Sequence, residues 1–305
     1  MRHLFTFVIL ALFSYETIAQ ISTEEYPYSW TRGLDISMKQ AIQTVTMPSL
    51  DLAKLHAEDL ENEGLLAAPA RFGFQHDVSL SLSNAGSWQT TSDGGRLWTL
   101  KIYSPDALSL NLLYNEFWLP EGAKFFLYST DKKQHIGAFT SQNNQGNREN
   151  IQGFATGLLL TSSIVLEYYE PKEVEKKGII SIDAVVSGYR YISDIAGTRH
   201  NLTNLSCHND IIDPVGSDYQ FEKNAIACIS MGAHVCTGFL LNTTANDRSP
   251  IFLTAEHCLC NARPLTQCVF YWNYEALSVG GVVSPTKSTV GANLKAKNVD
   301  KDFCC

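Results

Sequence analysis

A histidine next to a cysteine, just after an apolar run, is the feature of this sequence best suited to chemistry. His257 follows Ile251–Thr254, which predicts a short strand ending at a turn, and Cys258 comes directly after it. A second cysteine, Cys236, lies just ahead of another apolar run at residues 238–241. A Cys236–Cys258 disulfide would tie two strands together and hold the loop that presents the imidazole. Because a general base must stay within hydrogen-bond reach of its nucleophile, this arrangement predicts His257 as a catalytic base.

The residues around His257 also form a recognisable pattern. It consists of Cys236-Thr237-Gly238, Phe252-Leu253-Thr254-Ala255-Glu256-His257-Cys258 and, further along, Val269-Phe270-Tyr271-Trp272-Asn273-Tyr274. In this pattern the chain resembles the trypsin-like serine endopeptidases, most closely their secreted bacterial lysyl-endopeptidase-type branch, over residues 225–303. Glu256 departs from the generic motif, which has a small residue before the histidine, although the bacterial branch tolerates a polar residue there. The resemblance implies a hydrolase that cuts peptide bonds in proteins and needs no cofactor.

The resemblance implies a carboxylate partner for His257 as well. The family places its orienting aspartate in an Asp-Phe pair after a strand like residues 292–296, and Asp302 followed by Phe303 stands at that position. Such an aspartate holds the histidine in one tautomer and stabilises its charged form. The alternative for Asp302 is an ordinary solvated side chain.

The serine that the family requires is missing from the expected place. It lies in a glycine-rich Gly-x-Ser-Gly turn well after the aspartate, and residues 207–305 contain no such turn. Ser249 and Ser284 both precede prolines in expected loops without glycine-rich surroundings. The sequence therefore predicts a serine endopeptidase precursor that stops before its catalytic serine and is inactive in this form. The alternative function is a non-catalytic secreted β-sandwich, acting as an adhesion or inhibitory module, with a vestigial protease segment.

Length and charge restrict the class of protein. A chain of 305 residues predicts roughly two domains. The formal net charge of -8 argues against a nucleic acid partner, because binding to phosphates needs a basic surface. Protein or peptide substrates are the expected partners, and the oligomeric state stays open.

The N-terminus has the pattern of a secretory signal peptide. Arg2 precedes an apolar run at residues 4–13 that is too short to span a bilayer, and Ala19 offers a small residue for cleavage. The alternative is a buried N-terminal helix. Since no other apolar run approaches membrane-spanning length, residues 1–19 predict export, and the mature protein is expected outside the membrane in an extracellular or periplasmic location.

The cysteines agree with export. All eight lie between Cys207 and Cys305, and an oxidising destination favours disulfides. A metal cluster of His257, Cys258, Cys260 and Cys268 is the alternative, but the spacing lacks the usual Cys-x-x-Cys pairs, so no metal is expected. A Cys260–Cys268 bridge is plausible from its short loop, and the other pairings stay open.

The first two thirds of the chain predict strands after one helix. Ser49 would cap a helix carrying Leu52, Leu55, Asp59 and Leu60 near a 3.6-residue period, with Gly64 ending it. Strands separated by polar turns are then expected at residues 78–82, 97–103, 108–113, 124–128, 157–160 and 164–169. The predicted class is all-β, with an antiparallel β-sandwich followed by the first half of a trypsin-like double β-barrel.

The sandwich region resembles the pro-region of the same protease branch at residues 107–110 and 117–124. Residues 20–200 are therefore expected to be a pro-region, residues 201–305 the incomplete protease domain, and the polar linker at 194–204 the place of cleavage. The alternative is an unrelated carbohydrate- or protein-binding sandwich. Trp98 and Trp118 could stack on sugars there, although aromatic residues at strand spacing more often form a core.

Overall fold

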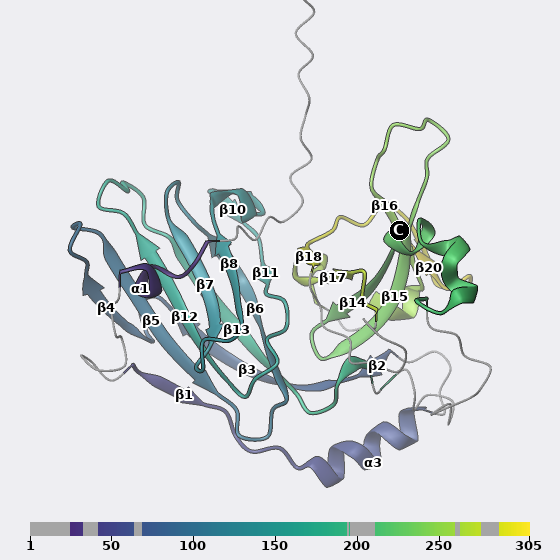
Figure 1. Ribbon diagram of the computed structural model, residues 1–305, viewed down its shortest axis with the longest axis horizontal. Coiled ribbons are helices and arrows are strands. Elements are labelled where there is room, and N and C mark those ends of the chain that lie inside the picture. The colour runs from purple at the N-terminus through teal and green to yellow at the C-terminus, as the bar shows by residue number, and fades with distance from the viewer. Residues whose placement is uncertain are drawn as a thin grey trace, which may run out of the picture.

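Two groups of β-sheets make up the chain, as Figure 1 shows for the computed structural model. It describes residues 25–32, 42–63, 69–193, 195, 211–259, 263–275 and 287–305. The predicted all-β class is confirmed. The expected signal peptide at residues 1–19 and the linker residue Arg199 lie outside the described residues. None of the described helices has the length and apolar composition needed to cross a membrane.

The first group is a sandwich of two sheets. One sheet has the order β1-β5-β12-β7-β8, with β4 also paired to β5, and the other has the order β11-β6-β13-β3. The first contains β1 (Thr44–Thr46), β4 (Ser87–Thr90), β5 (Arg96–Tyr103), β7 (Lys124–Ser129), β8 (His135–Phe139) and β12 (Ser163–Glu170). The second contains β3 (Gly73–Ser81), β6 (Ser109–Trp118), β11 (Phe154–Ala155) and β13 (Ile179–Gly188). Short elements complete the sandwich: α1 (Tyr28–Thr31), η1 (Ser141–Asn143), β9 (Gly146–Asn147) and β10 (Asn150–Ile151).

An aromatic core joins the two sheets of the sandwich. Trp98, Tyr114, Phe117, Phe125 and Phe154 are all buried in one cluster. Burial of so much apolar surface favours the fold at about 25 cal/mol per Å² removed from water. Since Trp98 is fully buried, it packs in the core and does not offer a platform for sugar binding.

The sandwich differs from the expectation in two details. Residues 157–160 form no regular strand, and only Leu159 makes an isolated bridge, to Leu110. The strand of this region is β11, which pairs with β6 a few residues earlier in the chain. The sandwich is also not wholly antiparallel, because β1 pairs with β5 in parallel.

The predicted helix is present as α3 (Leu52–Glu63), but its cap and its inward face differ from the prediction. Asp51 caps it in place of Ser49, since the Asp51 Oδ1 atom accepts a hydrogen bond of 3.0 Å from the backbone N of Lys54. Leu60 is exposed. Leu52 is exposed too, whereas Leu55 and Asp59 of the same predicted set are buried, and Asp59 binds Arg71 through a 2.8 Å ion pair.

The second group is one sheet with the order β18-β17-β14-β15-β16-β20-β19. Its strands are β14 (Ile226–Met231), β15 (His234–Leu241), β16 (Ile251–Thr254), β17 (Val269–Trp272), β18 (Lys287–Val290), β19 (Lys297–Asn298) and β20 (Phe303–Cys304). The 3-10 turns η2 (Pro214–Tyr219), η3 (Glu222–Ala225), η4 (Glu256–Leu259) and η5 (Leu265–Gln267) lie beside them. Over the described residues this sheet is open and is not closed into a barrel.

Two predicted strands of this sheet differ from those observed. β15 begins at His234, so Cys236 lies within the strand and not ahead of it. Residues 292–296 form no regular strand, because their partner is the irregular end of the chain, where the Cys305 carbonyl accepts from the backbone N of both Lys295 and Ala296.

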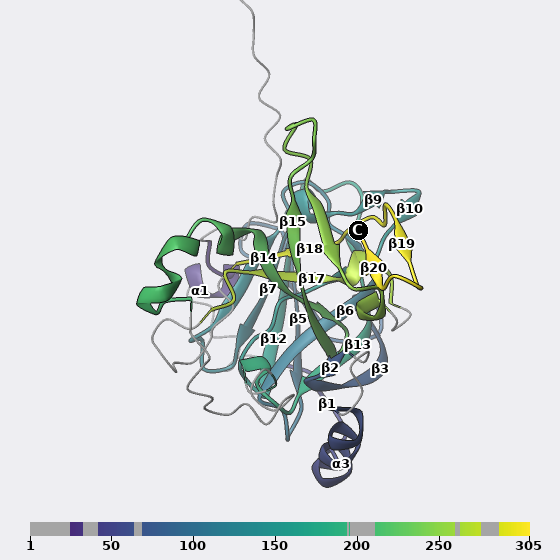
Figure 2. The ribbon, with the colours of Figure 1, turned by 90° about the vertical axis from the view of Figure 1, so that its right-hand side faces the viewer.

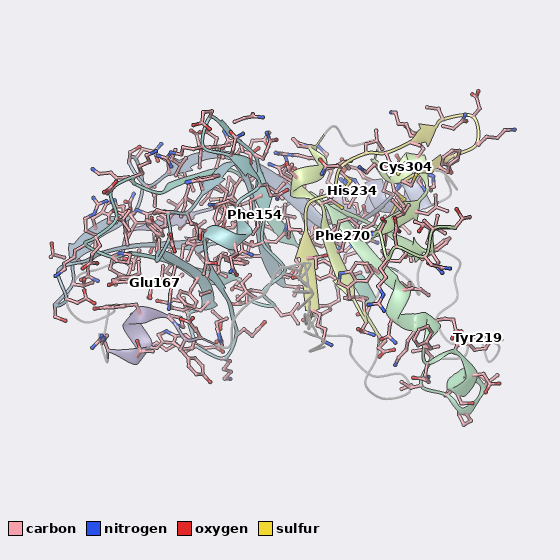
Figure 3. The ribbon with its side chains drawn as sticks, turned by 90° about the horizontal axis from the view of Figure 1, so that it is seen from above. Phe154, Glu167, Tyr219, His234, Phe270 and Cys304 are labelled. Atoms are coloured by element: carbon pink, nitrogen blue, oxygen red, sulfur yellow. A yellow bond between two sulfur atoms is a disulfide. The ribbon has the colours of Figure 1, made fainter. Side chains whose placement is uncertain are left out.

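One carboxyl group is buried inside the sandwich without a basic partner among the described contacts. Glu167, on β12 (Figure 3), is fully buried and accepts hydrogen bonds from the backbone N and the hydroxyl of Ser29 in α1. The Tyr128 hydroxyl donates to it as well, at 3.2 Å. Desolvation is the largest influence and raises the pKa of Glu167. Burial therefore disfavours the charged form of Glu167, although the donors from Ser29 and Tyr128 partly offset this.

This burial predicts a pH dependence of stability. Because the folded pKa of Glu167 lies above its unfolded value of about 4.3, its contribution is most favourable below about pH 4 and is lost as pH rises through the folded pKa. In Glu167→Gln, which carries the neutral form permanently, we expect the free energy of unfolding to decline less between pH 4 and pH 7. Urea unfolding followed by tryptophan fluorescence measures this difference. Glu116→Gln, on an exposed side chain of β6, is the control, and pH profiles of wild type and Glu167→Gln that run parallel would contradict the prediction.

Candidate active site

A disulfide fixes the turn that carries the candidate base. The structure contains the predicted Cys236–Cys258 bond, with the two Cα atoms 6.0 Å apart. Cys236 lies on β15 and Cys258 lies in η4, the 3-10 turn that follows β16. The bond therefore attaches the turn to the neighbouring strand, as the sequence indicated.

His257 lies in the same turn and contacts Asp302 through two hydrogen bonds. Its backbone N donates to the Asp302 Oδ1 atom at 3.0 Å, and its ring Nδ1 lies 2.8 Å from Oδ2. A carboxylate only accepts hydrogen bonds, so Nδ1 is the donor in this contact, and in the neutral ring the lone pair is then on Nε2. The contact holds the ring in the tautomer that a general base requires.

The register of a short strand pair brings these two residues together. β20 pairs with β16 at Thr254 and Cys304, which places the residues just after Thr254 beside those just before Cys304. Asp302 has a positive φ of 48° and donates its backbone N to the Val299 carbonyl at 3.2 Å, closing the turn that leads into β20. His257 and Asp302, which are 45 residues apart in the sequence, are thereby in direct contact.

The same hydrogen bonds stabilise the ionised form of Asp302. The backbone N–H of His257 is the largest cause of a lowered pKa at Asp302, and the His257 ring is the second. An ion pair flanks the turn, since Lys297 Nζ lies 3.3 Å from a carboxylate oxygen of Glu256. Glu256, the polar residue that departs from the generic motif, is thus held by Lys297 beside the dyad.

The lowered pKa leads to a prediction for His257→Ala. Removing the ring deletes a donor to the carboxylate, so we expect the pKa of Asp302 to rise toward its ordinary value. By linkage, a carboxylate with a depressed folded pKa stabilises the fold at pH values above its unfolded pKa of about 3.9. This stabilisation is lost as pH falls through the folded pKa. Carbonyl-carbon NMR of the Asp side chains gives both values. Lys297→Met serves as control, because it leaves both His257 donors in place, and an unchanged Asp302 pKa in His257→Ala would contradict the contact.

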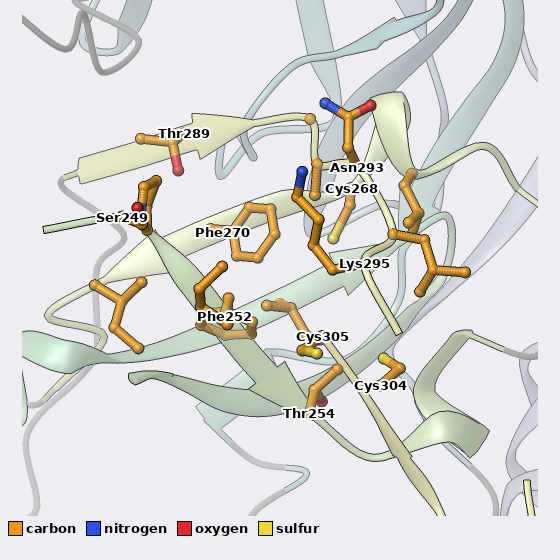
Figure 4. A pocket seen from close by; sticks show the side chains of 18 of the residues that line it. Ser249, Phe252, Thr254, Cys268, Phe270, Thr289, Asn293, Lys295, Cys304 and Cys305 are labelled. Carbon is orange, nitrogen blue, oxygen red and sulfur yellow. The ribbon is translucent and has the colours of Figure 1, made fainter. Parts of the chain in front are cut away.

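A serine nucleophile does not accompany the dyad among the described residues. There, the hydrogen bonds of the His257 ring run to Asp302 alone. Ser249 lies beyond the opposite end of β16 (Figure 4), where its backbone N donates to Asp247 at 3.0 Å. Ser284 lies outside the described residues.

The described cysteines near the dyad are either in the disulfide or a free thiol. The ligand atoms of Cys236, His257 and Cys258 lie within 4.8 Å of one another, but both sulfurs are in the disulfide and offer no thiolate to a metal. Cys268 is a free thiol, so the Cys260–Cys268 bridge is wrong. Burial raises the pKa of Cys268 to about 12, which keeps it protonated and poorly nucleophilic.

A cavity of about 590 Å³ lies beside β16, on the face of the open sheet that carries Phe252 and Phe270. Its walls are mostly apolar and include Trp272 together with Phe252, Phe270 and Cys304, which Figure 4 labels. The sequence gives no sign of this cavity, because its lining comes from β14, β15, β16, β17 and residues 289–295, which meet only in the folded sheet. His257 and Asp302 are not part of its described lining, so cavity and dyad are separate features.

The part of the chain that carries the dyad resembles known proteases. The family that matches is the lysyl endopeptidase C-terminal domain, and the match covers residues 203–305. A protease domain of this kind implies peptide or protein substrates. Residues 203–305, with the dyad and its disulfide, are therefore similar to a protease of the lysyl-endopeptidase type.

Proposed function

We propose that this chain is the precursor of a secreted serine endopeptidase, with His257 as general base and Asp302 as its orienting partner. The observation that carries the proposal is the paired contact of His257 with Asp302, held beside a disulfide, within the segment that matches lysyl endopeptidases. In this proposal residues 20–200 form the pro-region and residues 201–305 belong to the protease domain. The substrates are extracellular proteins.

The dyad would act in the order that acyl transfer requires. The His257 Nε2 atom takes the proton of a serine hydroxyl as that oxygen attacks the peptide carbonyl, and the imidazolium then gives the proton to the leaving amine. Asp302, which already accepts from Nδ1, stabilises the imidazolium without taking the proton. The serine and the backbone donors for the oxyanion would come from residues outside those described.

We expect a polypeptide of these 305 residues to show no amidase or esterase activity. General-base catalysis requires a hydroxyl within about 3 Å of the imidazole, and the described part of the chain offers none to His257. Turnover of lysyl and arginyl ester substrates, together with labelling by a fluorophosphonate, measures this. Stoichiometric labelling that disappears in His257→Ala would reveal a nucleophile within the chain and overturn this expectation.

A fusion tests the role of the dyad directly. The C-terminal part of a lysyl endopeptidase catalytic domain, starting after that enzyme's own Asp-Phe pair, is joined after Phe303 to supply the serine and the oxyanion donors. We expect the purified fusion to become labelled by the fluorophosphonate and to hydrolyse lysyl esters. A folded fusion with the disulfide intact but without labelling would count against a base at His257.

A further inference from the structure

The sheet of the second group has two apolar faces, and the alternation along β17 shows this most clearly. Val269 and Tyr271 are buried in a cluster with residues of the sandwich, whereas Phe270 packs in a separate cluster on the opposite side of the sheet. Trp272 adjoins the same cluster as Phe270. A strand buried on both faces has a continuous apolar sequence, as this one does. One face of the sheet therefore depends on the sandwich for its burial.

The cluster at this face is shared between the two groups. The sandwich contributes Phe72, Leu113, Leu158, Ala155, Ala184 and Val186, and the second sheet contributes Ala233, Val235, Val269 and Tyr271. Phe72 and Leu113 have no exposed surface, and Tyr271 has 1%. In Figure 3 the sandwich and the second sheet lie side by side along this face. A cluster that is so apolar and so completely buried resembles the core of an obligate interface more than that of a transient one.

Main-chain hydrogen bonds also cross the boundary. β2 (Ala70–Arg71) pairs with His234 and Val235 of β15, along the same edge of β15 that β16 uses further on. Just beyond this pair, the Phe72 backbone N donates to the Ala233 carbonyl at 2.9 Å. The chain entering the sandwich thus adds a strand to the sheet of the second group and covers an edge that would otherwise be open.

Polar contacts surround the shared cluster. Arg263 forms an ion pair with Asp183 on β13 and lies 3.6 Å from Asp77 on β3. The Gln267 side chain donates to the Tyr114 carbonyl at 2.9 Å. Within the cluster, the Leu158 backbone N donates to the Tyr271 hydroxyl at 3.1 Å. An apolar core surrounded by a rim of polar contacts is typical of a specific protein interface.

This interface lies away from the His257–Asp302 dyad. Figures 1 and 2 show β20, which follows Asp302 directly, on the side of the second group remote from the sandwich. The His257 side chain keeps 21% of its surface exposed. The sandwich therefore covers the outer face of the sheet and leaves the dyad open.

We propose that the sandwich, residues 42–193, remains bound to residues 211–305 after the linker between them is cut, covering one face of their sheet without plugging the dyad. The inference rests on the proposed division into pro-region and protease segment, but not on any catalytic activity. Without the sandwich, residues 211–305 would expose Val235, Val269 and Tyr271 together with the edge of β15. A continuous apolar surface of this kind promotes aggregation unless a partner covers it.

Cleavage of the linker in the full chain tests the proposal. The recognition sequence of a site-specific protease is inserted between Arg199 and His200, the purified protein is cut, and the product is run on a gel-filtration column in native buffer. We expect the two pieces to elute together and to separate only in denaturant. Separate elution of the two pieces in native buffer at micromolar concentration would overturn the proposal, whatever the outcome of the activity tests.

A charge exchange identifies the interface. Asp183→Arg places two cations together and is expected to weaken binding between the cut pieces by at least about tenfold, because the arginine it faces is largely buried. Asp183→Arg combined with Arg263→Asp is expected to restore binding. Glu116→Arg, on an exposed side chain of the neighbouring strand β6, is the matched control and should leave binding unchanged. If the cut pieces of the Asp183→Arg variant bind each other as tightly as those of wild type, the pieces associate through another surface and the proposed interface is wrong.

The open dyad gives a separate readout. Diethyl pyrocarbonate acylates accessible imidazoles, and peptide mass spectrometry measures the rate at each histidine. In the cut complex we expect His257, whose side chain keeps 21% of its surface exposed, to react, and His76, which is buried in the sandwich, to react only in denaturant. Protection of His257 that is relieved on separation would show that the sandwich plugs the dyad, against the proposal.

Discussion

Replacing His257 by alanine in the fusion that supplies the serine is expected to lower kcat by about 10⁶-fold. Without the imidazole, no group accepts the proton of the attacking hydroxyl. Asp302→Asn is expected to lower kcat by about 10⁴-fold, because an amide at this position can donate to Nδ1 and favours the wrong tautomer. The contact of 2.8 Å between Nδ1 and Asp302 is the structural basis of both effects.

Steady-state hydrolysis of a lysyl ester measures these losses, and fluorophosphonate labelling separates loss of chemistry from loss of folded protein. Asp300→Asn is the matched control, since Asp300 is an exposed carboxylate two residues from Asp302. It should leave kcat unchanged. If His257→Ala kept the activity of the parent fusion, another residue would have to serve as base, and the proposed role of the dyad would be wrong.

Loss of the Cys236–Cys258 disulfide is expected to lower the free energy of unfolding by about 3 kcal/mol. The bond closes a loop of 22 residues, so its removal gives the unfolded chain more conformational freedom. The loss should also loosen η4, because the bond attaches this turn to β15. We therefore expect the His257–Asp302 contact to weaken in the same variant.

The double variant Cys236→Ser/Cys258→Ser avoids a stray thiol, and urea unfolding of the full chain measures the change. Cys305→Ser is the control, since Cys305 is a free, half-buried cysteine that also lies near the end of β20. A double variant as stable as wild type, with the Asp302 pKa still lowered, would show that packing alone positions the turn.

Local sequence was enough to predict the features that depend on neighbouring residues. Alternating and apolar runs located β5, β7, β12 and β16, because burial on one or both faces imposes a period of two or a continuous apolar stretch. The Cys236–Cys258 pair was also predictable, since it joins a strand to the turn of the next strand in the chain. The helix α3 was predicted, but its cap was not, because Ser49 and Asp51 both have side chains that can cap a helix.

Contacts between distant segments could not be derived from periodicity. The sequence pointed to Asp302 only through resemblance, and the pairing of Thr254 with Cys304 is what places it against His257. Residues 157–160 look like a strand because they are apolar, yet Leu158 is buried in the cluster shared with the second sheet and Leu159 in the sandwich core without a regular ladder.

The chemistry of the site was thus determined largely by residue type, and its geometry by the tertiary structure. Residue type decides which atoms can accept a proton, form a disulfide or lose water. Register, and the burial of one sheet against another, decide which of those atoms meet. These depend on the whole set of packed strands, so the contact of His257 with Asp302 and the dependence of the second sheet on the sandwich became visible only in three dimensions.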